Sequence, residues 1–170
     1  MRGEDLKSNK RLLVFDTGAL LSKIQLQMYS DNIEIYTTPS VLEEVKDRES
    51  REALEVSLNI DRVRIAQPSE ATITYISKLA DSLGYLNKLS RTDIEVASLA
   101  YELNKYSKVT VLTDDYDLQN LLLHLNIEFA TVKTKGIREA RILRNKCRVC
   151  GYPLKSNDEE CPVCGSKSIG

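Results

Sequence analysis

Apolar and polar positions in residues 1–132 follow two alternating periods. Short, mostly apolar runs bounded by turn residues are typical of buried strands, and they occupy residues 11–15, 33–37, 62–65, 108–112 and 128–132. Between them, apolar residues recur every three or four positions, which predicts helices over 38–58, 69–83, 90–103 and 118–125. Strands and helices that alternate through short loops indicate an α/β fold, a parallel sheet flanked by helices on both faces.

Local signals mark the ends of these helices. Pro39 suits the first helical position, and Gly84 suits a helix end. Ser90 followed three residues later by Asp93 matches a capping box. We expect the first helix to run without interruption from Pro39 towards Leu58, because Val41, Leu42 and Val45 continue the apolar period into Leu54.

All four cysteines lie in the last 24 residues, as two Cys-x-x-Cys-Gly motifs separated by ten residues: Cys147, Cys150, Cys161 and Cys164. Four thiolates at this spacing match a tetrahedral structural zinc. Disulfides are disfavoured without an export signal, and a redox site would be a single Cys-x-x-Cys that opens a helix. The motifs therefore predict a small zinc ribbon whose metal supplies its stability and has no coordination position open for substrate.

Charge divides the chain into an acidic body and a basic tail. Residues 1–132 hold 15 Lys and Arg against 21 Asp and Glu, whereas residues 133–170 hold 9 against 4. Within the tail, residues 137–146 predict a short linker helix with one basic stripe, formed by Arg138, Arg141 and Arg144. A basic tail favours a polyanionic partner, of which nucleic acid is the commonest.

Composition is that of an ordinary globular protein, with 42% hydrophobic and 29% charged residues. No apolar run approaches the roughly 18 residues that a membrane span needs, and the polar start is not a secretory signal. We therefore expect a cytoplasmic protein that does not associate with membranes. The expected units are an α/β body over 11–135, a basic linker helix over 136–146 and the ribbon over 147–170.

Acidic residues gather where the predicted strands end and the following helices begin. They are Asp16, Glu43, Glu44, Asp93, Asp114, Asp115 and Asp117. In an open α/β sheet these positions share the edge at which ligands bind. Several carboxylates held together repel one another unless a cation is present, and oxygen ligands without His or Cys suit Mg²⁺ or Mn²⁺.

Each acid also fits a purely structural role. Asp93 can close a capping box, the aspartates after residue 113 can cap the following helix, and one of Glu43 and Glu44 can be a solvated charge. Asp16 is the hardest to explain in this way, because a carboxylate directly after a buried strand needs a partner. The pattern alone leaves metal ligands and helix caps as alternatives. His124, the lone histidine, lies among leucines and fits packing better than catalysis.

Four stretches resemble, in order, the acidic motifs of PIN-domain ribonucleases: residues 14–19, 39–45, 90–94 and 112–116. The segments 38–48, 89–101 and 114–120, followed by a zinc ribbon, are similar to one branch of that family. This branch is the Nin-one-binding endonucleases, which mature the 3′ end of small-subunit ribosomal RNA in archaea and eukaryotes. The resemblance runs from about residue 11 to the end, and the short ribbon is similar to archaeal members.

The resemblance implies a PIN-like sheet and catalytic carboxylates at Asp16, Glu44, Asp93 and Asp115. Asp16, Asp93 and Asp115 would hold one or two Mg²⁺ or Mn²⁺ ions, with Glu44 behind them. Glu44 is preferred over Glu43 because the family's acid precedes an apolar–basic pair, here Val45-Lys46, whereas the Thr-Asp-Asp motif allows Asp114 or Asp115. Supporting roles fall to Thr17, Glu43, Asp114 and Asp117.

The implied substrate is single-stranded precursor rRNA on the pre-small ribosomal subunit, with assembly-factor proteins as further partners. The residues expected to hold its backbone, through salt-sensitive contacts, are Arg138, Arg141, Arg144, Lys146 and Arg148. Three other functions stay open. They are a non-catalytic RNA-binding assembly factor, a toxin-like PIN ribonuclease that cuts tRNA or mRNA, and a zinc-ribbon DNA-binding protein.

Overall fold

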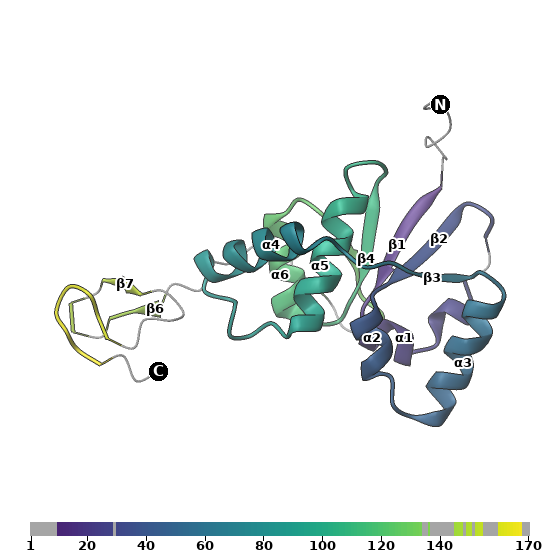
Figure 1. Cartoon of the computed structure of the whole chain (residues 1–170), viewed down its shortest axis with the longest axis horizontal. Coiled ribbons are helices and arrows are strands. Elements are labelled where there is room, and N and C mark those ends of the chain that lie inside the picture. The colour runs from purple at the N-terminus through teal and green to yellow at the C-terminus, as the bar shows by residue number, and fades with distance from the viewer. Residues whose placement is uncertain are drawn as a thin grey trace.

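The structure is a computed structural model of the whole chain (Figure 1). It describes residues 10–28, 30–133, 136, 145–147, 149–150, 152–154 and 160–167. Among these residues, no helix is both long and apolar enough to cross a membrane.

One five-stranded parallel sheet forms the centre of the body. Its strands are β1 (Arg11–Phe15), β2 (Ile33–Thr37), β3 (Val63–Ile65), β4 (Val109–Leu112) and β5 (Glu128–Ala130). Their order across the sheet is β3-β2-β1-β4-β5, and every neighbouring pair is parallel. The chain therefore adds β2 and β3 in turn on one side of β1, then crosses back and adds β4 and β5 on the other side of β1. The strand order reverses between β1 and β4, and ligands bind open α/β sheets at such a reversal.

Helices form the crossovers between the strands, as parallel pairing requires. They are α1 (Thr17–Leu21), the 3₁₀ helix η1 (Ile24–Leu26), α2 (Pro39–Glu44), α3 (Arg48–Asn59), α4 (Glu70–Ser82), α5 (Arg91–Leu103) and α6 (Tyr116–His124). The central helix is α5, which contacts β1 and β4 of the sheet and the helices α2, α4 and α6. Figure 1 shows the strands between these helices, and the predicted flanked parallel sheet is confirmed.

The core of the body is one continuous aliphatic cluster. Its largest fully buried apolar side chains are Phe15, Leu20, Ile35, Ile76, Leu118, Leu121 and Leu122. They come from β1 and β2 and from the helices α1, α4 and α6, and the same cluster includes Val109, Val111 and Leu112 of β4, so it holds the ends of the central strands in place. That placement in turn fixes the positions of the polar residues at the strand ends.

The prediction of one unbroken helix over 38–58 is wrong. Helix α2 ends at Glu44, Val45 is extended (φ −75°, ψ 94°), and α3 begins at Arg48. Asp47 caps the new helix by accepting a 2.8 Å hydrogen bond from the Ser50 N–H, and Arg51 Nε donates to the Val45 carbonyl at 2.8 Å. Val45 is fully buried, so the apolar period runs through the break and hides it.

Other differences from the sequence-based elements are smaller. The short helices α1 and η1 were not predicted, because five and three residues are too few to display a period. Helix α6 begins at Tyr116, two residues before the predicted start, because the Asp115 carboxylate caps it by accepting from the Leu118 N–H at 2.8 Å. Strand β5 ends at Ala130, two residues early.

The described part of the tail contains two short strands, β6 (Asn145–Lys146) and β7 (Pro153–Leu154), which pair antiparallel. The predicted linker helix is therefore wrong at its last two residues, which form β6. Its other residues, 137–144, lie outside the described residues, so the predicted basic stripe of Arg138, Arg141 and Arg144 is not described. Arg148 also lies outside the described residues. A backbone hydrogen bond from Cys147 to Tyr152 and one from Cys161 to Ser166, each 2.8 Å, fold the two cysteine motifs into turns.

Candidate active site and cysteine cluster

Asp16 lies where β1 ends at the strand-order reversal. Its backbone N–H donates to the Leu112 carbonyl at 3.2 Å, which joins the ends of β1 and β4. Its side chain is 8% exposed and caps α1 by accepting from the Ala19 N–H at 2.7 Å. Burial raises the pKa of this carboxyl to about 6, and hydrogen bonds from Thr113 and Ala19 only partly offset that rise. The charges of Asp93 and Asp114 raise the pKa further.

Asp93 lies at the start of α5, where the predicted capping box is present. Its Oδ2 accepts from the Ser90 N–H at 2.7 Å and from the Ser90 hydroxyl at 2.8 Å. Burial raises the pKa of this carboxyl, the Ser90 hydrogen bonds oppose the rise, and the charges of Asp115 and Glu44 add to it. A residue that caps a helix is thus also held within electrostatic reach of two further acids.

Glu44 is the last residue of α2, and its position depends on the helix break described above. Its Oε2 accepts a 2.5 Å hydrogen bond from the Thr17 hydroxyl, which comes from the first residue of α1. Glu43 is also exposed, and it lines a pocket between α2 and α5. The structure therefore places Glu44 next to Thr17, the residue after Asp16, and within electrostatic reach of Asp93.

The three aspartates that follow β4 have different surroundings. Asp114 accepts hydrogen bonds from the backbone N–H groups of Val132 and Lys133 at 2.9 and 3.0 Å, so its carboxylate holds the chain beyond β5. Asp115 is exposed, caps α6 and acts on Asp93. Burial raises the pKa of Asp117, with a smaller opposing effect from Lys88.

Asp16, Glu44, Asp93 and Asp115 are called the carboxylate cluster below. They come from the ends of β1 and α2 and from the starts of α5 and α6, and a chain of electrostatic effects links them through Asp93. They are not packed as closely as the four sulfurs of the tail. Oxygen-only donors with raised aspartate pKa values are the donor set that suits a hard divalent cation.

Thr113 is a site residue that sequence reasoning missed. It is fully buried, its hydroxyl hydrogen-bonds to Asp16, and its Oγ1 accepts from the Asp115 N–H at 3.1 Å. One side chain thus links two members of the carboxylate cluster. Its sequence signal, a threonine between a strand and two aspartates, does not distinguish it from an ordinary loop residue.

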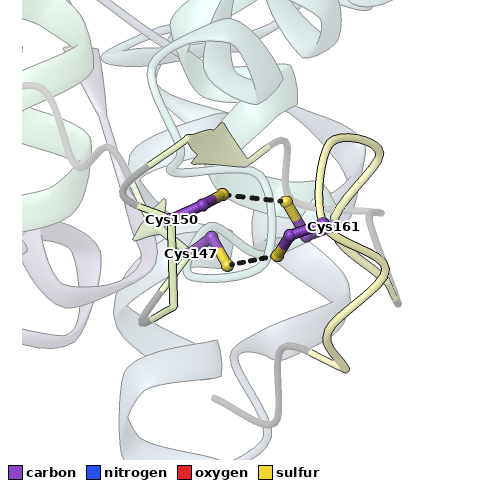
Figure 2. Close-up of side chains that lie close together, drawn as sticks. Cys147, Cys150 and Cys161 are labelled. Carbon is purple, nitrogen blue, oxygen red and sulfur yellow. Dashed lines mark hydrogen bonds between the residues drawn. The ribbon is translucent and has the colours of Figure 1, made fainter.

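The four cysteines form a second cluster, shown in Figure 2, with ligand atoms that all lie within 4.8 Å of one another. The Sγ–Sγ distances are 3.5 Å for Cys147–Cys164 and 3.6 Å for Cys150–Cys161, so each contact joins one motif to the other. The geometry fits a zinc ribbon, because four thiolates around one point are the ligand set of structural zinc.

Ser166 is a further residue that the spacing of the cysteines did not reveal. Its hydroxyl lies 2.9 Å from Cys147 Sγ and 3.1 Å from Cys164 Sγ. Together with the backbone N–H groups of Cys150 and Val149, it lowers the pKa of the Cys147 thiol to about 6. These donors favour the thiolate form, which is the form that binds metal.

Comparison with known proteins identifies the family. A family model described as the PIN domain of ribonuclease matches residues 13–103. Endoribonuclease Nob1 of Methanothermobacter thermautotrophicus is 40% identical over 138 residues, which cover 80% of this chain and 81% of that protein. Ribonuclease VapC3 of Aeropyrum pernix is 33% identical over 130 residues, covering 76% and 91%. The 20S-pre-rRNA D-site endonuclease NOB1 of Saccharomyces cerevisiae is 30% identical over 100 residues, covering 59% and 22%.

The PIN-domain match covers β1 to α5 and agrees with the parallel sheet of the body. Relatives that share two thirds or more of their length with this chain are named as ribonucleases, so the chain is an enzyme that cleaves RNA. The chain belongs to the PIN-domain ribonuclease family and, within it, to the Nob1 endoribonucleases.

Proposed function

We propose that this endoribonuclease cleaves single-stranded precursor rRNA to mature the 3′ end of the small-subunit rRNA, with Asp16, Glu44, Asp93 and Asp115 as its catalytic carboxylates. The observation that carries the catalytic assignment is the raised pKa of buried Asp16 and half-buried Asp93 beside the other two acids. The rRNA target is supported by the yeast relative, whose name specifies a pre-rRNA cleavage site.

Mg²⁺ or Mn²⁺ is the cation that fits these donors, held by Asp16, Asp93 and Asp115 with Glu44 behind them. When bound, one or two such ions supply an activated water and neutralise charge on the scissile phosphate. The chain itself holds the carboxylates in place. Asp16, Asp93 and Asp115 are each fixed by a backbone hydrogen bond at a helix start, and Glu44 is fixed by Thr17.

Asp115 is preferred over Asp114 as a ligand because of what each carboxylate already does. Both oxygens of Asp114 accept from the backbone of the segment after β5, which makes it a positioning residue. Asp115 is exposed, and its Oδ1 caps α6 by accepting from the Leu118 N–H. Asp117 is the second residue of α6, where its charge supports the same region.

The tail has a structural and a binding role in this proposal. Zinc held by the four cysteines folds residues 147–170, and the basic residues of the 136–146 linker and the ribbon bind the RNA backbone. The residues proposed for that contact are Arg138, Arg141, Arg144, Lys146 and Arg148. The remaining body, 11–135, is the nuclease unit. The proposed setting is the pre-small ribosomal subunit in the cytoplasm, with assembly-factor proteins as partners.

The test is cleavage of an RNA that spans the mature 3′ end of the small-subunit rRNA, in Mn²⁺, with the cut mapped by primer extension. We expect a single major cut for the wild type and a rate lower by about 10³-fold or more for Asp16→Asn. Asp47→Asn is the matched control, because Asp47 is also an N-cap aspartate, at α3, and its loss should leave the rate unchanged.

Each rival function has its own outcome in this assay. Equal rates for the wild type and Asp16→Asn would contradict the catalytic role and favour a non-catalytic assembly factor. Preferential cutting of a tRNA in the same tube would favour a toxin-like target. Tighter binding of duplex DNA than of single-stranded RNA would favour a DNA-binding ribbon.

A further inference from the structure

A pocket of about 430 Å³ lies beside the carboxylate cluster, between α2 and the first turns of α5. Its lining includes Ser40, Glu44, Lys46, Gln67, Arg91 and Glu95. Glu44 belongs to both places, because it lines the pocket and accepts the hydrogen bond from Thr17. The pocket therefore adjoins the proposed reacting centre, and the catalytic proposal assigns no role to its other residues.

One ion pair in the pocket differs from an ordinary surface pair. Arg91 Nε donates to Glu95 Oε1 at 2.8 Å, one helical turn apart on α5, and the Glu95 side chain is only 3% exposed. Arg48 and Glu52 on α3 make the same i,i+4 contact at 2.7 Å, but the Glu52 side chain is 61% exposed. Exposed pairs of this kind contribute little stability, whereas a buried carboxylate requires its cation. Glu95 thus anchors Arg91 at the pocket.

The anchored guanidinium retains donors for a ligand. The contact with Glu95 uses the Nε–H, one of five N–H groups, and the Arg91 side chain remains 84% exposed. A guanidinium held in this way loses little further conformational entropy when it binds a planar or anionic group. Lys46, which follows the end of α2, adds a second cation to the same lining.

The donors and acceptors that line the pocket indicate which class of ligand fits it. It mixes acceptors, the carboxylates of Glu43 and Glu44, with donors from Arg91, Lys46 and the Gln67 amide. A bare phosphate has acceptors only, whereas the edge of a nucleobase presents donors and acceptors together. The volume of the pocket falls within the range of about 300–1,000 Å³ that is usual for small-ligand sites. A base with its attached phosphate uses both kinds of group.

We infer that this pocket binds one unpaired nucleotide adjacent to the scissile phosphate, its base inside the pocket and its phosphate on Arg91 and Lys46. This inference rests on the proposed cleavage of single-stranded RNA. It adds a sequence preference at one position beside the cut, with Gln67 hydrogen-bonding to the base edge. Glu95 is a positioning residue that acts through Arg91, and α2 and α5 together supply the base-binding wall.

The experiment couples an RNA change to a protein change. Abasic nucleotides are placed one at a time within three positions of the mapped cut, and binding is measured by fluorescence anisotropy with no Mg²⁺ or Mn²⁺ added, so that no cleavage occurs and the ribbon keeps its zinc. For the wild type we expect one position at which the abasic site weakens binding by about tenfold, as loss of the base's hydrogen bonds to the pocket predicts. For Arg91→Ala we expect weaker binding overall and a much smaller loss at that position, because a nucleotide whose phosphate is not held by Arg91 no longer places its base in the pocket.

Arg48→Ala is the matched control, since it removes the same charge from the same kind of helix pair outside the pocket. It should keep the full tenfold abasic effect. Because Arg91→Ala leaves Glu95 buried without its cation, the double variant Arg91→Ala/Glu95→Gln is measured as well, with thermal unfolding to verify its fold. Arg91→Lys should recover part of the binding, and in cleavage assays the Arg91 variants should change KM more than kcat.

Two results would overturn the inference. One is an abasic effect that persists in full in the folded Arg91→Ala/Glu95→Gln variant, and the other is an equal loss of that effect in Arg48→Ala. Failure here is distinguishable from failure of the catalytic proposal. If Asp16→Asn abolishes cleavage while Arg91 shows no coupling, the nuclease assignment stands and only the nucleotide pocket is rejected.

Discussion

The carboxylate cluster and the cysteine cluster each gather four candidate ligand side chains, yet they stand in opposite relations to the fold. The carboxylates sit on a sheet and helices that a continuous aliphatic core already holds in place. The cysteines lie outside β6 and β7, which have two residues each, and Cys147 and Cys161 are the buried hydrophobic side chains among the described residues of that region. In the body the fold positions the ligands, whereas in the ribbon the ligands must position the fold.

This difference predicts the sign of each cluster's effect on stability. Burying Asp16 beside other acids raises its pKa, so in the absence of a cation the ionised cluster destabilises the body. The described residues of the ribbon include no comparable core, so metal–thiolate bonds are the expected source of its stability. Removing a carboxylate should therefore stabilise the body, and removing a thiolate should unfold the ribbon.

The largest expected effect is loss of the ribbon on removal of zinc. Cys161→Ser, or chelation of the wild type, should abolish amide protection over residues 145–167, because structural zinc contributes on the order of 10 kcal/mol to such folds. Hydrogen exchange followed by mass spectrometry reports this region separately from the body. Metal analysis should give one zinc per wild-type chain. Earlier exchange throughout the body would contradict the independence of the two regions.

The second effect has the opposite sign. Without divalent cations at pH 7, Asp16→Asn should stabilise the body by up to about 3 kcal/mol, measured by urea unfolding. The pKa of Asp16 in the folded state, about 6, lies above its ordinary value of 3.8, so the folded state binds the proton more tightly. Wild-type stability therefore falls as pH rises from about 4 to about 6. The gain from Asp16→Asn should disappear near pH 4.

Asp47→Asn provides the contrast for this measurement. The backbone N–H of Ser50 lowers the pKa of Asp47, so the ionised Asp47 stabilises the fold above its ordinary pKa and loses that effect as pH falls. Its replacement should destabilise the body at pH 7 or leave it unchanged. Equal stabilisation by both substitutions would show that removal of any negative charge is enough.

The third effect is stabilisation of the wild-type body by a divalent cation, which offsets the destabilisation caused by the ionised carboxylate cluster. Mn²⁺ at about one hundred times its dissociation constant should stabilise the wild-type body by about 2.7 kcal/mol, since the cation binds only the folded cluster. The same addition should change Asp16→Asn much less. Thermal unfolding of both proteins, with and without Mn²⁺, measures the difference, and an equal shift in both would place the cation outside the cluster.

The smallest expected effect concerns Thr17. Thr17→Val removes the hydroxyl that donates to Glu44 while keeping the shape of the side chain, so kcat should fall by about tenfold at most. The melting temperature should stay close to that of the wild type, because this hydrogen bond is exposed. A large fall in stability would mean that Thr17 acts through the packing of α1.

The sequence predicted all five strands of the sheet and the acids at their ends, because apolar periods and strand-end polarity are local signals. The break at Val45 could not be predicted in the same way, since a fully buried residue satisfies the apolar period of a helix or a loop. Thr113 and Ser166 could not be singled out either, because their roles depend on partners 97 and 19 residues away, Asp16 and Cys147. The pocket joins α2 to α5 and exists only in the folded chain.

One feature of the cluster bears on how such an enzyme can change over time. Asp16 and Asp115 are the N-caps of α1 and α6, and Asn, Ser or Thr caps a helix nearly as well as Asp does. A single replacement of this kind would remove a charged ligand and leave every helix start intact. A descendant that lost the nuclease activity would therefore fold as well as its ancestor, or better, and would remain available as a binding protein.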